Sequence, residues 1–316
     1  MLKVFAPASV GNLSVGFDAL GLALQAVEGE VLGDVVSLRA GPQDDWILRC
    51  TGPFAHELPE DPEANIVMMS CRRFERKVRA SGKETETLQV TLDKRLPVGS
   101  GLGSSASSIV ATLVALNRFF GKPLNRFELL ELMAEMEASI SGEVHLDNIA
   151  PSLLGGLRLC LPDGAHQHGL PWPGRWQVLV AWPGTHTETK AARELLPSEL
   201  PRSLTVAHGA QFAHFVHELH AGEPRDAARC LVDLIAEPFR RSLIPDFDKA
   251  KEALMRMGAL AFGISGSGPT VFAIVDDSRV AAEGEAWLKE NFLKTEQGFV
   301  RRCRADLAGA RQLNDA

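Results

Sequence analysis

A segment of twelve residues, PVGSGLGSSASS (97–108), constrains this chain more than any other part of its sequence. It contains three glycines, five serines and no charged residue, and an apolar run over 109–116 follows it directly. Glycines let backbone N–H groups adopt positive φ angles and approach a ligand closely. A glycine-rich turn that opens a helix directs unpaired N–H groups and the positive end of the helix dipole toward one point, which favours phosphate. The segment therefore predicts a phosphate-binding loop that leads into a buried helix, with a plain loop capped by serines as the alternative.

Two common phosphate-binding loops do not fit this segment. The Walker A pattern GxxxxGK[ST] occurs nowhere in the sequence. The dinucleotide pattern GxGxxG is also unmatched, because residues 99–103 read GxGxG and no strand with a ribose-binding acid follows at the expected distance. The sequence therefore predicts a phosphate loop of a third type.

Composition and charge exclude several classes of protein. The chain has 316 residues, a formal net charge of -7 and no run of more than two Lys/Arg residues, so nothing predicts binding to nucleic acid or to a membrane. Its five cysteines lie far apart without a CxxC pair, which is typical of reduced thiols in the cytoplasm rather than of disulfides or a zinc site. The first residues contain no continuous apolar segment of the signal-peptide kind, so we expect them to belong to the folded protein.

Hydrophobic periodicity and turn residues predict an α+β chain with a mainly antiparallel sheet. A segment rich in Gly, Pro and His, LPDGAHQHGLPWPGRW (161–176), predicts a boundary between two domains, 1–165 and 166–316. The predicted strands are 31–39, 88–92, 177–182, 261–264 and 270–275, and the predicted helices are 109–120, 126–140, 203–221, 223–235 and 247–257. The phosphate loop is therefore expected in the first domain.

Three histidines, His214, His217 and His220, follow one another at intervals of three residues in the predicted helix 203–221. This spacing spreads the rings over a wide arc, so the three could not easily meet one metal ion. We therefore predict a solvated helix face rather than a metal site.

Three segments resemble the motifs of the GHMP kinases and occur in the order of that family. PVGSGLGSSAS (97–107) is similar to the nucleotide-binding motif PxxxGLGSSA, and the other two segments are APASVGNLSVGFDALGLAL (6–24) and GISGSGPTVFA (263–273). The resemblance implies transfer of a phosphoryl group from ATP to a small molecule. It also implies two α+β domains, the first similar to the second domain of ribosomal protein S5 and the second ferredoxin-like.

The homoserine kinase branch of that family is matched in particular by PASVGNLSVGFDALG (7–21), EVHLDNIAPSLLGG (143–156) and EPFRRSLIPDF (237–247). A sugar-binding signature of the galactokinase kind is absent near the N-terminus. The resemblance implies L-homoserine as the phosphoryl acceptor, a place in threonine biosynthesis and a homodimer. A kinase of the same family acting on a substrate such as mevalonate or shikimate is one alternative, and a non-catalytic nucleotide-binding regulator is another.

The resemblance also assigns residues to the nucleotide site. Mg²⁺ prefers hard oxygen ligands, and the positions matching the family's metal ligands are Ser105 and Glu137, although a solvated carboxylate beside Glu135 is the alternative for Glu137. Asn65 matches a position that lines the nucleotide pocket, with a helix cap as the alternative. The predicted ATP-binding residues are Asn65, Pro97, Val98, Gly99, Ser100, Gly101, Leu102, Gly103, Ser104, Ser105, Ala106 and Ser107.

The acceptor site is assigned in the same way. Asp147 is predicted to be catalytic together with the two metal ligands, because an aspartate beside polar partners can orient a substrate hydroxyl or accept its proton; a capped turn is the alternative. Homoserine carries an ammonium and a carboxylate, so Asp18 is predicted to pair with the first, and Arg193 and Arg240 with the second. The predicted substrate-binding residues are Asn12, Asp18, His145, Asp147, Asn148, Thr189, Arg193, Arg240 and Gly266.

Overall fold

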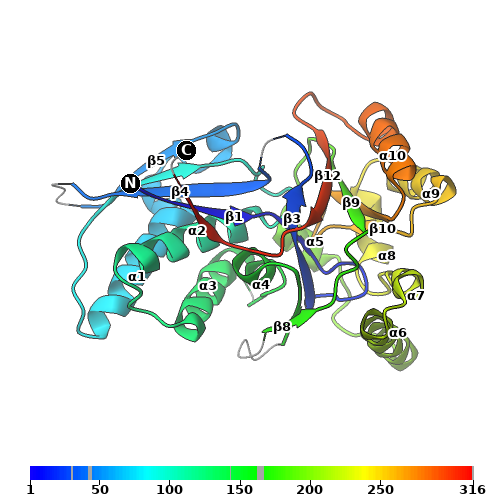
Figure 1. Ribbon diagram of the computed structural model, residues 1–316, viewed down its shortest axis with the longest axis horizontal. Coiled ribbons are helices and arrows are strands. Elements are labelled where there is room, and N and C mark those ends of the chain that lie inside the picture. Colours follow the sequence, from blue (N-terminus) through cyan, green and yellow to red (C-terminus); the bar gives the residue numbers. More distant parts are fainter. Residues whose placement is uncertain (30, 42–44, 143, 162–166, 315–316) are drawn as a thin grey trace.

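Two β-sheets with helices packed against them make up the protein (Figure 1). A computed structural model describes residues 1–29, 31–41, 45–142, 144–161 and 167–314. The strands are β1 (Leu2–Pro7), β2 (Ser9–Gly11), β3 (Leu20–Ala26), β4 (Gly33–Arg39), β5 (Ile47–Thr51), β6 (Gln89–Asp93), β7 (Leu157–Cys160), β8 (Gln167–Leu170), β9 (Gln177–Trp182), β10 (Ala261–Ile264), β11 (Val271–Val275), β12 (Phe299–Ala305) and β13 (Arg311–Leu313). The predicted α+β class is confirmed.

The first sheet has five strands in the order β13-β1-β4-β6-β5, and β5 and β6 are its one parallel pair among the described strands. The second sheet has eight strands, in the order β10-β11-β9-β12-β3-β7-β8 with β2 added against β3. Its pairings are antiparallel throughout the described residues. The prediction of mainly antiparallel sheet is therefore confirmed.

Both sheets join segments from opposite ends of the sequence. β13 pairs with β1, placing Leu313 opposite Lys3, so the two chain ends lie close together (Figure 1). β12 pairs with β3, placing Cys303 opposite Ala26. These pairings cross the proposed division after residue 165. Within the predicted boundary segment, β8 pairs with β7, whereas residues 162–166 lie outside the described part of the chain.

The helices cover the faces of the two sheets. They are α1 (Ile66–Ala80), α2 (Ser104–Phe119), α3 (Arg126–Ser141), α4 (Ile149–Leu154), α5 (Thr189–Glu194), α6 (Arg202–Ala221), α7 (Pro224–Arg229), α8 (Glu237–Arg240), α9 (Phe247–Met257) and α10 (Ser278–Asn291), with short 3-10 turns at Ala55–Glu57, Pro62–Ala64 and Arg241–Leu243. None of the helices in the described ranges combines the length and apolar character needed to cross a bilayer. The three histidines of α6, at 214, 217 and 220, are exposed.

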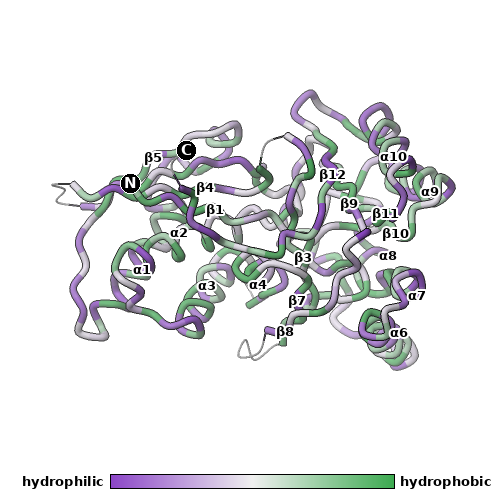
Figure 2. The backbone as a smooth tube through the Cα atoms, viewed as in Figure 1, coloured by the Kyte–Doolittle hydropathy of each residue, from purple (hydrophilic) through white to green (hydrophobic). Residues whose placement is uncertain are grey.

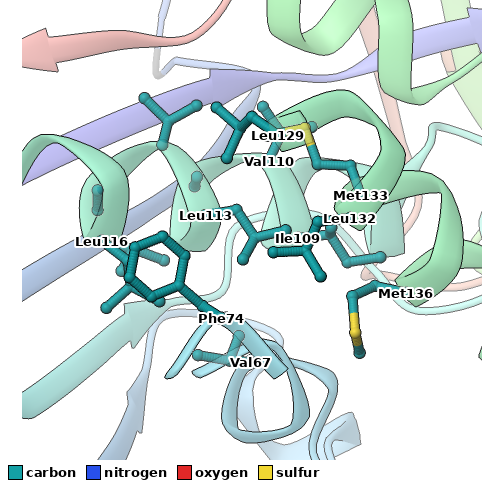
Figure 3. Close-up of a cluster of buried hydrophobic side chains, with 14 of the residues drawn as sticks. Val67, Phe74, Ile109, Val110, Leu113, Leu116, Leu129, Leu132, Met133 and Met136 are labelled. Atoms are coloured by element: carbon teal, nitrogen blue, oxygen red, sulfur yellow. The ribbon is translucent and has the colours of Figure 1, made fainter. Parts of the chain in front are cut away.

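α2 is the central helix of the first half of the chain. Thirteen of its residues are buried, and apolar side chains from α1, α2 and α3, such as Phe74, Leu113 and Met133, meet in one cluster (Figure 3). A helix that is apolar on nearly all sides must be buried on nearly all sides. α1 is amphipathic instead, and hydrophilic and hydrophobic residues alternate along it (Figure 2).

The second half forms a layer of helices on each face of its sheet. Val178 and Val180 of β9 belong to a core cluster that includes apolar residues of α6 and α7. Leu179 and Ala181, which point to the opposite face because side chains alternate along a strand, belong to a cluster with α9 and α10. The alternation explains why β9 is apolar from Val178 to Trp182 yet has two distinct faces.

Two predicted helices have different ends from those expected. The helix predicted over 109–120 begins earlier, at Ser104, because buried hydrogen bonds hold serines that helix propensity alone disfavours. The helix predicted over 223–235 ends at Arg229. The carboxylate of Asp233 accepts the backbone N–H groups of Ile235 and Ala236 at 2.8 and 2.7 Å, and this local turn competes with a continued helix.

The buried ion pair between Asp34 and Lys94 fixes the start of α2. Asp34 is 0% exposed and Lys94 is 1% exposed, and Lys94 Nζ lies 2.6 Å from Asp34 Oδ2. Lys94 also donates to the carbonyl oxygen of Ser104 and to Ser108 Oγ, both at 3.0 Å. The other carboxylate oxygen of Asp34 accepts the N–H of Leu96 at 3.1 Å. β4, the residues before the glycine-rich loop and the first turn of α2 are thereby tied together.

Replacing one member of this pair is expected to be strongly destabilising. Asp34→Asn leaves the Lys94 ammonium buried without its carboxylate, which should lower the free energy of unfolding by about 3–5 kcal/mol in urea denaturation. The double variant Asp34→Asn/Lys94→Met should lower the free energy of unfolding by less than the sum of the losses in Asp34→Asn and Lys94→Met, because both changes remove the same interaction.

The matched control is Glu283→Gln, which removes one member of an exposed pair with Arg279 on α10. Exposed pairs contribute little, so this variant should change stability by less than about 1 kcal/mol. Equal losses at the two sites would contradict the structural role of the buried pair.

Candidate active site

A cavity of about 810 Å³ lies beside the glycine-rich loop. Its walls come from that loop, the starts of α1 and α2, the end of α3 and residues 186–188 and 190. Apolar side chains such as Ile66 and Met69 line one part of it, and serines and carboxylates line another. Cavities of roughly 300–1,000 Å³ with a few polar groups among apolar ones are typical of small-molecule and cofactor sites.

Glycine conformations shape the loop. Gly99, Gly101 and Gly103 have φ angles of 64°, 82° and 64°, in the region that side chains disfavour. A Cβ atom at Gly101 would lie 2.5 Å from the carbonyl oxygen of Ser265. α2 begins directly after Gly103 and, within the described chain, receives no side-chain cap. The N–H groups of its first turn are therefore left for a ligand.

The three sequence motifs converge at this loop. From the late glycine string, Ser265 Oγ donates to the Gly101 carbonyl oxygen at 2.6 Å, and the Thr270 N–H donates to the Ser100 carbonyl oxygen at 3.1 Å. The N–H of Gly266 donates to the carbonyl oxygen of Gly11, in the first motif, at 3.1 Å. The late glycine string therefore packs closely against the loop.

The residues predicted to bind ATP divide into two groups. Those that line the cavity are Asn65, Val98, Gly99, Ser100, Gly101, Gly103, Ser104 and Ser105. Those that are buried outside its lining are Pro97, Leu102, Ala106 and Ser107. Ser107 Oγ donates to the Ala6 carbonyl oxygen at 2.8 Å, so the second group supports the loop from the core. The buried hydroxyl of Ser100 has no partner within the described residues, which fits a polar ligand in the cavity.

Ser105 and Glu137 lie in contact at the cavity wall. Ser105 Oγ lies 3.1 and 3.0 Å from the two carboxylate oxygens of Glu137. Burial raises the pKa of Glu137 to about 7, and the bond from Ser105 opposes that rise. Within the described residues no group of three or more His, Cys, Asp or Glu side chains is placed to hold a metal ion. A cation here would be held by these two residues, with oxygen atoms of water and of a bound phosphate compound completing its coordination shell.

Asn65 caps a helix and also lines the cavity. Its side-chain oxygen accepts the N–H of Val67 at 2.9 Å and so caps α1, and the same residue lines the cavity. The nucleotide-pocket and helix-cap hypotheses are therefore compatible.

Asn12 connects the parts of the predicted acceptor site. Its backbone N–H donates to Asp147 Oδ2 at 3.1 Å, and its Nδ2 donates to the Gly266 carbonyl oxygen at 3.0 Å. Its Oδ1 accepts the N–H of Asp18 at 2.9 Å. Asn12 and Asp18 have positive φ angles of 66° and 55°, which asparagine and aspartate tolerate better than most residues.

Asp18 and two arginines form the charged part of this site. The guanidinium of Arg193 donates to both carboxylate oxygens of Asp18, at 3.0 and 3.2 Å, and His145 Nδ1 lies 3.5 Å from Asp18 Oδ1. Arg240 is 3% exposed and donates to the carbonyl oxygens of Ala192 and Gly266 at 3.1 and 3.2 Å. The Arg193 and Arg240 guanidinium groups lie 5.9 and 5.7 Å from the ring centre of Phe17.

Asp147 is a buried carboxylate with few compensating partners. Burial, together with the negative charges of Asp18 and Glu137, raises its pKa to about 7, while the hydrogen bond from the N–H of Asn12 opposes the shift. A carboxyl that titrates near neutral pH suits proton transfer. Oδ1 of the next residue, Asn148, accepts a hydrogen bond from the Ser9 hydroxyl at 2.8 Å.

The acceptor site and the cavity share a border. Asn148 and Gly266 line the cavity, and they lie beside Asp147 and Asn12 of the acceptor site. α5 extends along both, with Arg193 bonded to Asp18. Thr189 is the first residue of this helix, but its side chain lies outside the part that the structure describes.

Several residues of the site were not foreseen. Lys94 and Lys190 line the cavity, and neither belongs to a motif that the sequence pattern singles out. Glu57 accepts the N–H of Val98 at 2.6 Å, and His186 Nδ1 lies 2.6 Å from the carbonyl oxygen of Val98. A glutamate and a histidine far apart in the sequence thus hold one loop residue, and only the fold reveals this.

Comparisons with known proteins agree with this arrangement. Two family models match the sequence, the GHMP kinases N terminal domain over residues 65–156 and the GHMP kinases C terminal region over residues 215–293. The chain is similar to a homoserine kinase from Cytophaga hutchinsonii, with 33% identity, a TM-score of 0.88 and coverage of 99% of this chain and 97% of that chain.

Two more distant structures share the fold. A putative homoserine kinase from Listeria monocytogenes has 21% identity, a TM-score of 0.73 and coverage of 100% of both chains. A mevalonate kinase from Methanococcus jannaschii has 14% identity, a TM-score of 0.69 and coverage of 96% of this chain and 98% of that one. Since the family models match both halves and a relative matches almost from end to end, this chain belongs to the GHMP kinase family.

Proposed function

We propose that this GHMP kinase transfers the γ-phosphoryl group of ATP to the hydroxyl of L-homoserine, giving O-phospho-L-homoserine for threonine biosynthesis. The observation that carries the proposal is the meeting of one carboxylate and two guanidinium groups, Asp18 with Arg193 and Arg240, beside a cavity of nucleotide size. The same proposal takes the enzyme as a cytoplasmic homodimer, with residues 1–165 as its nucleotide-binding domain and 166–316 as its second domain.

The charges of the site complement a free amino acid. Arg193 and Asp18 neutralise each other in the structure. An α-ammonium group arriving at Asp18 would release Arg193, which could then join Arg240 in binding the α-carboxylate. Mevalonate and shikimate lack the ammonium, so their carboxylate could engage Arg193 only by leaving the charge of Asp18 uncompensated, and a site of this kind should reject them.

Arg240 is held in place before any substrate binds. The two carbonyl oxygens that it contacts are bonded through Nε and Nη1, and among the described residues Nη2 has no hydrogen-bond acceptor, so it could bind a carboxylate. A guanidinium fixed in this way loses little conformational freedom on binding. The charge and the fixed position of Arg240 support the proposal that it binds the carboxylate of homoserine.

Ser105 and Glu137 would hold Mg²⁺. The convergence of a hydroxyl with two carboxylate oxygens, and the burial that raises the pKa of Glu137, fit such an ion. When bound, the ion neutralises charge on the β- and γ-phosphates. Asp147, beside the border of the two subsites, would orient the homoserine hydroxyl and accept its proton.

The relative from Cytophaga hutchinsonii supports the choice of acceptor. It is named a homoserine kinase and shares 33% of its residues with this chain over almost the full length of both. The more distant relatives support the fold alone. The choice of homoserine as acceptor therefore rests on this relative and on the charged residues of the site.

Loss of the metal ligands is expected to impair turnover rather than substrate binding. Glu137→Gln and Ser105→Ala should each lower kcat by roughly 10²–10³-fold, since they remove groups that act mainly on the developing phosphoryl charge. The homoserine KM should change little in steady-state kinetics. The control is Glu135→Gln. Glu135 lies on the same helix as Glu137, is exposed and pairs with Arg73 of α1. Near-normal turnover of Glu137→Gln at modest Mg²⁺ would show that the metal assignment is wrong.

Arg240→Lys keeps a positive charge but loses the planar fork that binds a carboxylate. We expect the homoserine KM to rise roughly 10-fold or more, as the loss of one charge-assisted hydrogen bond implies, while the ATP KM hardly changes. Wild type should strongly prefer homoserine over 3-aminopropan-1-ol, which lacks the carboxylate, and the variant should prefer it much less. Arg241→Lys, at an exposed neighbouring position, is the control. Equal discrimination by wild type and Arg240→Lys would show that Arg240 does not bind the carboxylate.

The pH profile should have a steep acid side. Both Glu137 and Asp147 have a pKa raised to about 7 by burial, so both are increasingly protonated, and inactive in their proposed roles, as the pH falls below 7. The logarithm of kcat/KM should then fall with a slope approaching two, because kcat/KM reports groups of the free enzyme. In Asp147→Asn the slope should be one at a lower overall rate. A flat profile between pH 5 and 8 would contradict the requirement for ionised carboxylates.

A further inference from the structure

We infer that Lys190 binds the phosphoryl group being transferred and stabilises the charge that develops on it. The inference rests on the proposed nucleotide site and extends it by one residue that no motif of the sequence indicates. Lys190 belongs to the first turn of α5 and lines the cavity.

The glycine-rich loop has too little positive charge for its proposed task. It contains no lysine or arginine, in contrast to a Walker A loop, which supplies a lysine of its own. Backbone N–H groups and the helix dipole contribute only about half of an elementary charge. A triphosphate carries more negative charge than one divalent cation neutralises, so transfer requires a further cation from outside the loop.

Lys94 cannot supply that cation. It lines the cavity, but its ammonium lies 2.6 Å from the Asp34 carboxylate and 3.0 Å from both the Ser104 carbonyl oxygen and Ser108 Oγ. An ammonium group has three donors, so these three acceptors use all of them. Its charge is also balanced by a buried carboxylate, and it therefore serves the loop rather than a ligand.

Lys190 meets the requirement. It is exposed to the cavity and, in the described ranges of the chain, forms no ion pair or hydrogen bond through its side chain. Among the described lysines and arginines that line the cavity, it is therefore the one whose charge is uncommitted. A lysine on a flexible stem can follow phosphate oxygens as a point charge.

The position of Lys190 on α5 places it between the two subsites. Arg193 lies three residues later on the same helix, and residues at this spacing share a face. Arg193 is bonded to Asp18 in the acceptor site, whereas Lys190 lines the nucleotide cavity. The phosphoryl group must cross this border during transfer.

The role leaves Lys190 chemically unchanged. The bond between the γ-phosphorus and the β–γ bridging oxygen breaks, a bond to the acceptor oxygen forms, and the hydroxyl proton passes to Asp147. Lys190 keeps its proton throughout and stabilises the negative charge spread over the phosphoryl oxygens.

Nucleotide binding and turnover together test this role. Lys190→Met should weaken Mg·ATP binding roughly 10-fold, as expected for loss of one charge-assisted contact, and leave Mg·ADP binding almost unchanged in calorimetry without acceptor. It should lower kcat roughly 10²-fold or more, while the homoserine KM stays similar. Lys190→Arg, which keeps the charge, should recover much of both losses. Lys249→Met, an exposed lysine on α9, should behave as wild type.

The outcomes separate this inference from the proposed function. Equal weakening of ATP and ADP, or an unchanged kcat, in a folded Lys190→Met protein would overturn the role at the phosphoryl group. If wild type binds ATP but phosphorylates no homoserine, the proposed acceptor fails, yet the comparison of ATP with ADP still decides the role of Lys190. Absence of ATP binding by wild type would overturn both.

Discussion

The buried pair of Asp34 and Lys94 is the interaction on which the active site depends. Removing two charges from water is costly unless both are well bonded, and here every donor of the lysine has an acceptor. The pair anchors the chain before the glycine-rich loop through Leu96 and after it through Ser104. A loop rich in glycine is flexible when free, so anchoring at both ends gives it a defined conformation without bulky side chains in the cavity.

The second constraint is the convergence of three distant segments at Gly266. Its N–H bonds to Gly11, and its carbonyl oxygen accepts from Asn12 and Arg240. The acceptor site is thus held against the late glycine string, and that string is bonded to the phosphate loop through Ser265 and Thr270. Phosphoryl transfer depends mainly on positioning and charge stabilisation. These contacts meet the first need, and the proposed roles of Lys190 and of a cation held by Ser105 and Glu137 meet the second.

Local sequence patterns were sufficient for much of the fold. Strand β9 and helix α9 have the predicted ends, and the glycine-serine segment does open a buried helix beside a cavity. Local patterns failed where partners far apart in sequence decide the structure. The early start of α2 depends on Lys94 and Asp34, which are separated by 60 residues. The place of Lys190 in the cavity likewise follows from tertiary packing, since a lysine in a polar segment has no distinctive signal.

The most direct test of the central claim is an ADP-release assay of the wild-type protein across homoserine, mevalonate, shikimate and galactose, with Mg·ATP held constant. The account predicts rapid turnover with L-homoserine and little above background with the others, since the ammonium and the carboxylate together match Asp18, Arg193 and Arg240. Turnover with mevalonate, shikimate or galactose that equals or exceeds turnover with homoserine would contradict it.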